Sequence, residues 1–196
     1  MRRHPLLGAG ALMLAIAAPI AANDGPFGPD DHVELVFLRS VRQYVALRDE
    51  VTRGAPVLES SPDPEEIHAV REARASAIAA ARRHAKIGDV FTTDVQEPLR
   101  GRIRDGLAAC GWSEADSLRF VDEDSDPRAV LAVNGPFPWT FGSTMLPCVI
   151  AALPPLPAGL EYRFYHAALV LVDVEVDLVV DILPAVLREL SYARAG

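Results

Sequence analysis

The fold is decided by one stretch of the C-terminal half, LEYRFYHAALVLVDVEVDLVVDIL, residues 160–183. Over residues 160–165, apolar and polar side chains alternate, which is the period of a half-buried strand. Two runs rich in β-branched residues, 169–174 and 178–182, predict a second and a third strand. Because only residues 166–168 separate the first two strands, we expect a hairpin and a small, largely antiparallel sheet.

Upstream of this stretch, the spacing of apolar residues predicts amphipathic helices. Over residues 32–53, apolar side chains recur at intervals of three and four, and Gly54 follows as a stop signal. A further helix is expected after the candidate N-cap Thr92 and should fade at Gly111. A short helix and then a loop should occupy residues 113–127.

The helix with the clearest start signals lies between these two. Asp63 provides an N-cap, Pro64 suits the first helical position, and Glu66 is the acid of a capping box. The pattern continues to about Lys86, and Gly88 closes it.

The order of elements predicts the fold class. The apolar run 129–133 suits a short strand, residues 146–153 suit a short helix, and Pro184 can start a final helix that runs through Leu190. The chain is therefore expected to be α+β, with N-terminal amphipathic helices packed on one side of a small, largely antiparallel C-terminal sheet. We expect one domain, residues 32–196, with no internal repeat.

The N-terminus predicts export. Basic Arg2 and Arg3 precede an apolar Ala/Leu-rich run, and small residues lead to a cleavage site after Ala22. We expect residues 1–22 to be a signal peptide and residues 23–31 a flexible leader, which places the domain in the periplasm or outside the cell. An uncleaved membrane anchor is the alternative, because about 18 apolar residues approach the length that spans a bilayer.

Charge restricts the class of partner. The loss of Arg2 and Arg3 with the signal peptide would take the formal net charge from −8 to −10. An acidic chain lacks the concentrated basic surface that phosphate binding needs, so no nucleic-acid partner is expected. Contact with a membrane is expected only if the signal segment stays uncleaved. No cofactor is predicted, and the partner is left as an unidentified protein or small ligand.

The two cysteines, Cys110 and Cys148, allow two interpretations. Export would deliver both to a compartment where a disulfide persists. Two buried thiols that act as small apolar side chains are the alternative. The sequence leaves both open, because it does not give the distance between the two Cα atoms.

Acidic residues of the predicted sheet are the first candidates for metal binding. Asp173, Glu175, Asp177 and Asp181 have the same parity, and converging carboxylates can hold a hard cation. Acids on the solvent-facing side of a sheet give the same pattern, and this is the interpretation we favour. Residues 122–133 lack the glycine and the final glutamate of a calcium loop, so no metal site is predicted.

Two surfaces are candidates for recognition. Glu161 and Arg163, with tyrosines on either side of Arg163, could contact a partner, although a cross-strand ion pair and core aromatics explain them equally well. Residues 136–139, Pro-Phe-Pro-Trp, form the other candidate, since aromatic residues beside rigid prolines favour binding. For this second patch, a lid over the core is the interpretation we favour.

Several motifs resemble those of a family of exported bacterial proteins of unknown function. They are the DPEEI motif at 63–67, GDVFT at 88–92, VN at 133–134, and LPPLP at 153–157 followed by LEYRF at 160–164. The resemblance covers residues 63–187 and implies export and a single domain, with no catalytic residue to carry over. The family pattern has a Gly-Arg-Asp-like turn where this chain has residues 166–168, and an Asn at Asp177, which puts the hairpin turn in doubt.

These observations lead to two functional hypotheses. The first is a soluble, exported, non-enzymatic module that binds a protein or a small ligand, because the familiar nucleophile, zinc and phosphate-binding motifs are missing. The second is a hydrolase or other enzyme with an unfamiliar site, built from Asn134, Arg163, Asp173 and Asp181 near one end of the sheet. A deep pocket that collects these four side chains would favour the enzyme.

Overall fold

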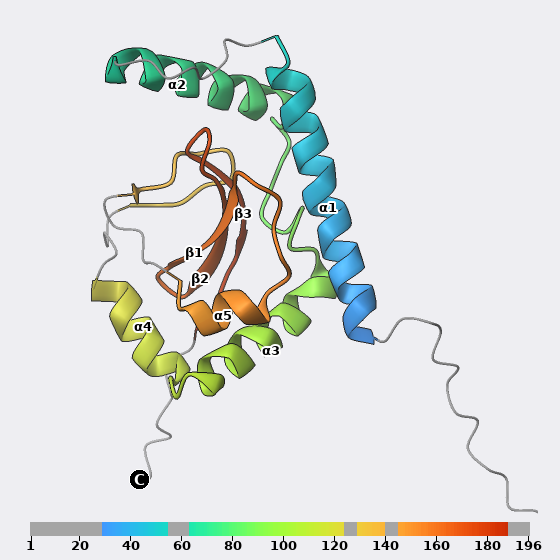
Figure 1. Cartoon of the computed structure of the whole chain (residues 1–196), viewed down its shortest axis with the longest axis vertical. Coiled ribbons are helices and arrows are strands. Elements are labelled where there is room, and N and C mark those ends of the chain that lie inside the picture. Colours follow the sequence, from blue (N-terminus) through green and yellow to red (C-terminus); the bar gives the residue numbers. More distant parts are fainter. Residues whose placement is uncertain (1–28, 55–62, 124–128, 140–144, 188–196) are drawn as a thin grey trace, which may run out of the picture.

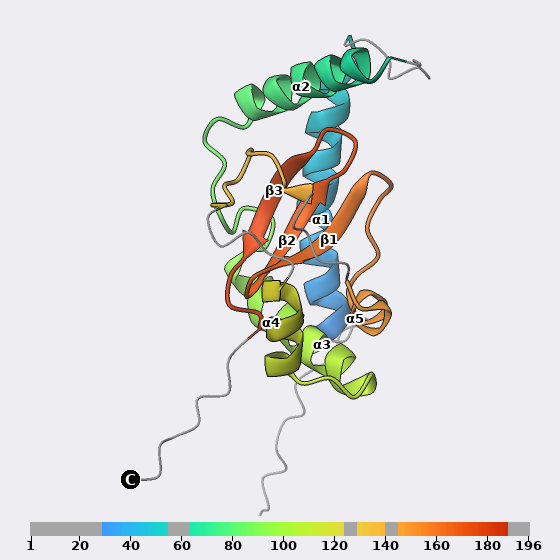
Figure 2. The same ribbon diagram turned by 90° about the vertical axis from the view of Figure 1, so that its left-hand side faces the viewer.

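The computed structural model describes residues 29–54, 63–123, 129–139 and 145–187. Within these described ranges five helices precede three strands, which confirms the α+β class. In both views α2 (Pro64–Ala81) lies beyond the C-terminal end of α1 (Pro29–Thr52), and the three shorter helices lie at the opposite end of the sheet (Figure 1, Figure 2).

The sheet is antiparallel, and its strands follow one another in chain order. It contains β1 (Leu160–Tyr165), β2 (Ala168–Asp173) and β3 (Leu178–Leu183). The alternation in residues 160–165 and the two runs rich in β-branched residues therefore predicted these strands to within a residue at each end. A bulge interrupts the β2–β3 pairing: Leu171 faces Asp181, but the next pair is Val172 with Val179. Val180 is the extra residue, and bulges of this kind change which face the neighbouring side chains take.

Helix α1 lies along the sheet and supplies one wall of the core. Phe37, Val41 and Tyr44 are buried at the predicted spacing of three and four, and the ring of Phe37 stacks on that of Phe91. The helix begins at Pro29, before the expected start at residue 32. Proline suits the first helical position and acidic residues suit the first turn, which accounts for the earlier start.

Helix α2 begins as its capping signals predict but ends early. The Asp63 side chain accepts a hydrogen bond from the Glu65 N–H at 2.9 Å. Ile78 is the one fully buried side chain of this helix, which packs on α1. The helix stops at Ala81 instead of continuing to Lys86, because Arg82 turns toward the sheet and forms tertiary hydrogen bonds.

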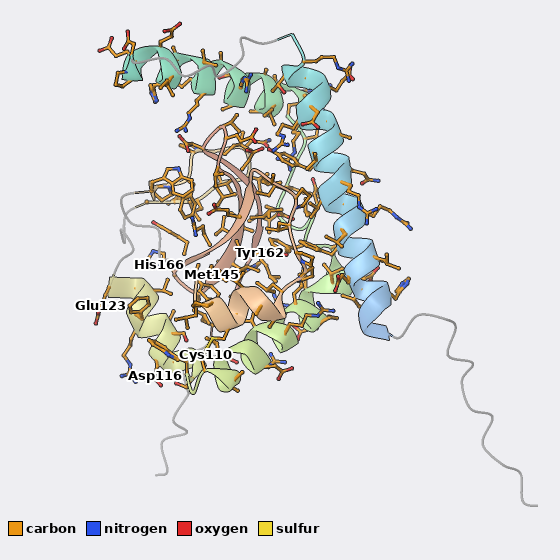
Figure 3. All side chains as sticks on the ribbon, viewed as in Figure 1. Cys110, Asp116, Glu123, Met145, Tyr162 and His166 are labelled. Carbon is orange, nitrogen blue, oxygen red and sulfur yellow. A yellow bond between two sulfur atoms is a disulfide. The ribbon has the colours of Figure 1, made fainter. Side chains whose placement is uncertain are left out.

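The remaining helices close the opposite end of the sheet. They are α3 (Thr93–Ala109), α4 (Glu114–Glu123) and α5 (Pro147–Ala152). Helices α3 and α5 approach closely at Gly106, where an added Cβ would lie 3.0 Å from the backbone of α5. A disulfide joins Cys110 to Cys148 with a Cα–Cα distance of 6.2 Å, which decides between the two interpretations of this pair. Figure 3 shows Cys110 at the end of α3.

Both faces of the sheet are covered. The larger cluster lies between the sheet and the helices, and a smaller one lies on the other face, where residues 129–139 cover the sheet. We call residues 129–139 the lid segment. It contributes Phe137, which is buried against Tyr165 and Val179 among others. The expectation that the second face is wet was therefore wrong.

One predicted element does not form, and another does not begin where it was expected within the described residues. Residues 129–133 are irregular instead of a fourth strand, and Val130 is 90% exposed. Pairing with β3 begins only afterwards, where Asn134 and Phe137 donate to the carbonyls of Val179 and Asp177. Residues 184–187 are also irregular, because the N–H groups of Val186 and Leu187 bond to Ala167. The rest of that predicted helix lies outside the described residues.

The hairpin forms although its turn departs from the family pattern. His166 and Asp177 both have positive φ, 47° and 55°. This region favours glycine and asparagine, so both departures fall where the backbone is least tolerant of other residues. Asp122 at the end of α4 contacts the His166 ring at 2.9 Å, and Figure 3 shows His166 close to this end of the helix.

The disulfide should contribute measurably to stability. Cys110 and Cys148 are 38 residues apart, and the closed loop contains the lid segment. Replacing both residues by serine should lower the free energy of unfolding by about 2 to 4 kcal/mol, because the unfolded chain regains the entropy of that loop. Urea denaturation with and without reductant measures this effect. Two labelled thiols in the unreduced protein, or equal stability of the variant, would contradict it.

Candidate functional site

Asp173 of β2 is part of a buried structural network. It is fully buried, accepts a hydrogen bond from the Tyr44 hydroxyl at 2.7 Å, and lies 3.4 Å from the Arg48 guanidinium. Its other oxygen accepts from the Glu175 N–H. Burial raises the pKa of this carboxyl, and the hydrogen bond from Tyr44 and the charge of Arg48 oppose that effect. Asp173 therefore ties α1 to the sheet.

Asp181 of β3 holds the loop between α2 and α3. Its two carboxylate oxygens accept four backbone hydrogen bonds, each 2.7 or 2.8 Å long, from the N–H groups of Gly88, Val90, Phe91 and Ile182. Burial raises the pKa of Asp181, and these hydrogen bonds oppose the rise. Residues 88–91, the GDVF part of the GDVFT motif, thus place three backbone N–H donors around one buried carboxylate.

These positions argue against a metal site at the four acidic candidates from the sequence. Asp173 and Asp181 are occupied by protein donors, while Glu175 and Asp177 lie in the β2–β3 turn. Among the residues that the structure describes, no cluster of three or more His, Cys, Asp or Glu side chains is placed to hold a metal ion. The wet-face interpretation of these acids was also wrong for the two aspartates, because α1 and the loop between α2 and α3 bury them on the helix-covered face of the sheet.

Arg82 links the end of α2 to the lid segment. Its guanidinium donates to the Asn134 side chain and to the Val180 carbonyl, both at 2.9 Å, and it lies over the Tyr44 ring. Asn134 returns a hydrogen bond to the Arg82 carbonyl and has a positive φ of 66°. No sequence pattern indicated this role for Arg82, which lies in the stretch that was expected to stay helical to about Lys86. Asn134, by contrast, was a candidate and does lie at the edge of a groove.

That groove is the best candidate site. It has a volume of about 360 Å³ and lies between α2 on one side and the lid segment and the β2–β3 turn on the other. Small residues of α2, Ala75, Ser76 and Ala79, face it. Trp139 lines it and is 40% exposed, which is unusual for so large an apolar side chain. We call this space the α2 groove.

Charged side chains border the α2 groove. Arg71 of α2 lies 3.5 Å from Asp177 of the turn, and the two residues are paired across the groove. His68 and Glu72, one turn apart on α2, also line it. The arrangement is an apolar floor with a polar rim, which is typical of recognition sites.

Arg163, the fourth candidate from the sequence, lies on the far side of Trp139. Its guanidinium stacks over the Trp139 ring, 5.5 Å from the centroid, and forms an ion pair with Glu161. It borders a second hollow along β1 and not the α2 groove. The four predicted site residues are therefore not gathered in one pocket: two are buried, and two flank Trp139 from different sides.

Comparison of the chain with protein-family models, with curated proteins and with solved structures found no match to any of them. Within the described residues, no helix is both long and apolar enough to cross a membrane.

The buried position of Asp173 predicts how stability changes with pH. Its native pKa is raised above the ordinary 3.8, so the unfolded chain loses this proton first as pH rises. The contribution of Asp173 to stability is then complete below pH 3.8 and is lost as pH rises through the native pKa. The non-titrating variant Asp173→Asn lacks this loss.

We therefore expect the difference in unfolding free energy, wild type minus Asp173→Asn, to fall as pH rises above 3.8. The slope should be at most about 1.4 kcal/mol per pH unit. Urea denaturation of both proteins at a series of pH values measures it. A difference that stays constant or grows over this range would contradict the assignment.

Proposed function

We propose that this chain is an exported, non-enzymatic binding module that takes a segment of a partner protein in the α2 groove. The observation that carries the proposal is Trp139: a half-exposed aromatic side chain at an open, apolar-floored groove. Exposed tryptophans are costly to leave in water and are enriched at the centres of binding sites. A groove of about 360 Å³ can hold one or two side chains of a partner.

The positions of the titratable groups favour binding over catalysis. Catalysis by the four residues considered above would require them to meet around one substrate. The carboxylate oxygens of Asp173 and Asp181 instead accept hydrogen bonds from protein donors. The Asn134 side chain accepts a hydrogen bond from Arg82 and donates one to the Arg82 carbonyl. The α2 groove itself is bordered by Arg71 and Asp177, which neutralise one another.

The walls of the groove suit a preorganised site. The end of α2 is fixed through Arg82, and the lid segment is fixed through Asn134 and by pairing with β3. A site whose walls are already in place loses little conformational entropy on binding. Location in the periplasm or outside the cell is part of this proposal. It is supported by the signal-peptide pattern of residues 1–22 and by the disulfide, which persists in oxidising compartments.

A site-specific photo-crosslinker tests the proposal. Benzoylphenylalanine introduced at Ser76, which faces the α2 groove, should capture a defined partner when the protein is produced in its native host. The same group at Ala73, an exposed position that is not part of the groove lining, is the matched control. Mass spectrometry identifies the captured protein and the linked peptide.

The proposal predicts one dominant adduct at Ser76 that is absent at Ala73 and is reduced about tenfold or more by Trp139→Ala, because that change removes a large contact area. Adducts that are the same at both positions, or that survive the loss of Trp139, would contradict it.

A further inference from the structure

The outer edge of β1 is arranged to accept another strand. Among the described residues, no strand pairs with this edge. The Val174 N–H donates to the Gly159 carbonyl at 2.9 Å, so every second residue from Gly159 onward directs its backbone groups toward β2. Leu160, Tyr162 and Phe164 therefore direct theirs toward the outer edge, where the Leu160 N–H already donates to the Pro157 carbonyl at 3.2 Å. Exposed edges of this kind are templates for pairing with another chain.

A hollow with an apolar shelf runs along this edge. Its volume is about 460 Å³, and it is lined by β1 and by a shelf made of Ile150, Pro154, Pro155 and Leu156. Ile150 is 50% exposed. The Tyr162 hydroxyl donates to the Pro154 carbonyl at 3.0 Å, which fixes the shelf on the helix side of the strand. An incoming strand would find both backbone partners and apolar surface here.

The side chains of β1 are complementary to those of a second β1. If two such strands pair antiparallel about a two-fold axis at Tyr162, Glu161 of each copy faces Arg163 of the other. The directions of the backbone groups agree with this register, because the backbone groups of Tyr162 in one copy then form a hydrogen-bonded pair with those of Tyr162 in the other. Glu161 and Arg163 project on the same face, so the two ion pairs form side by side.

We propose that two copies of the chain associate through their β1 strands, antiparallel about a two-fold axis at Tyr162, to form one continuous six-stranded sheet. An isologous contact of this kind is the commonest form of homodimer. Because the Leu160 N–H is already bonded to the Pro157 carbonyl, the new ladder is short and centred on Tyr162. Burial of Ile150 and Leu156 against the second copy supplies the apolar part of the interface.

A single chain offers a competing explanation of the same charges. Glu161 pairs with Arg163 within one strand, Arg163 stacks on Trp139, and charges on an edge strand can block pairing. The dimer and this internal pair are distinguishable, because only the dimer depends on what the second copy carries. The interface also lies outside the α2 groove, so this proposal and the proposed function fail or hold separately.

Charge exchange between copies tests the dimer. A copy with Glu161→Arg has two cations on β1, and a copy with Arg163→Glu has two anions. Each alone should place like charges opposite one another and raise the dimer dissociation constant about tenfold or more. An equimolar mixture should restore the dimer, and so should the double variant Glu161→Arg/Arg163→Glu. Sedimentation velocity at about 100 μM, a concentration that reveals micromolar association, measures the species.

Variants with the same charge changes at exposed positions of α2 and the loop after it, Glu65→Arg and Arg83→Glu, are matched controls and should remain dimeric. A monomeric wild type at this concentration would overturn the proposal. So would a mixture that stays monomeric, or control variants that dissociate as much as the β1 variants.

Discussion

The carboxylate of Asp181 is the constraint on which the rest of the structure depends. A charged group in a fully buried position is very costly unless donors surround it. Here four backbone N–H groups do so, three of them from the loop between α2 and α3. Gly88 has a φ of 92°, a conformation that suits glycine and turns the loop around the carboxylate. The sheet thereby fixes the loop that leads into α3.

The fixed end of α2 explains the rest of the architecture. Arg82 follows directly after α2 and bonds both to β3 and to Asn134, so α2, the sheet and the lid segment meet at one point. Tyr44 of α1 lies beneath the Arg82 guanidinium and donates a hydrogen bond to Asp173, so α1 is linked to the same point. The α2 groove opens beside this junction, and its two walls are each anchored there. Its shape therefore follows from the polar contacts made at that junction.

Much of this fold could be predicted from local pattern. The alternation in residues 160–165 and the capping signals at Asp63 are local, and both predicted their elements closely. The burial of Asp181 could not be predicted from local pattern, because the bulge at Val180 breaks the alternation that assigns each residue of the strand to one face of the sheet. The apolar run 129–133 suits a strand, but that part of the lid segment runs irregularly across the sheet, and pairing with β3 begins only at Asn134.

The candidate site was harder to predict for the same reason. Sequence reasoning favoured charged residues on strands, and the fold buries two of them as structural links. The groove combines α2, the lid segment and the β2–β3 turn, which lie far apart in the chain. Residues 136–139 were predicted correctly only in part: Phe137 is the buried lid that was expected, while Trp139 is exposed and lines the α2 groove. No pattern within one segment indicates which of two neighbouring aromatics faces outward.

Hydrogen exchange at the loop amides tests the central claim most directly. If Asp181 organises the fold, the N–H groups of Gly88, Val90 and Phe91 should exchange only through global unfolding, as slowly as the core of the sheet. In Asp181→Asn one carboxylate oxygen becomes an N–H₂ group that cannot accept, so one oxygen's pair of donors should exchange about a hundredfold faster or more. Exchange of these amides at the rate of exposed loops in the wild type, or no acceleration in the variant, would contradict the account.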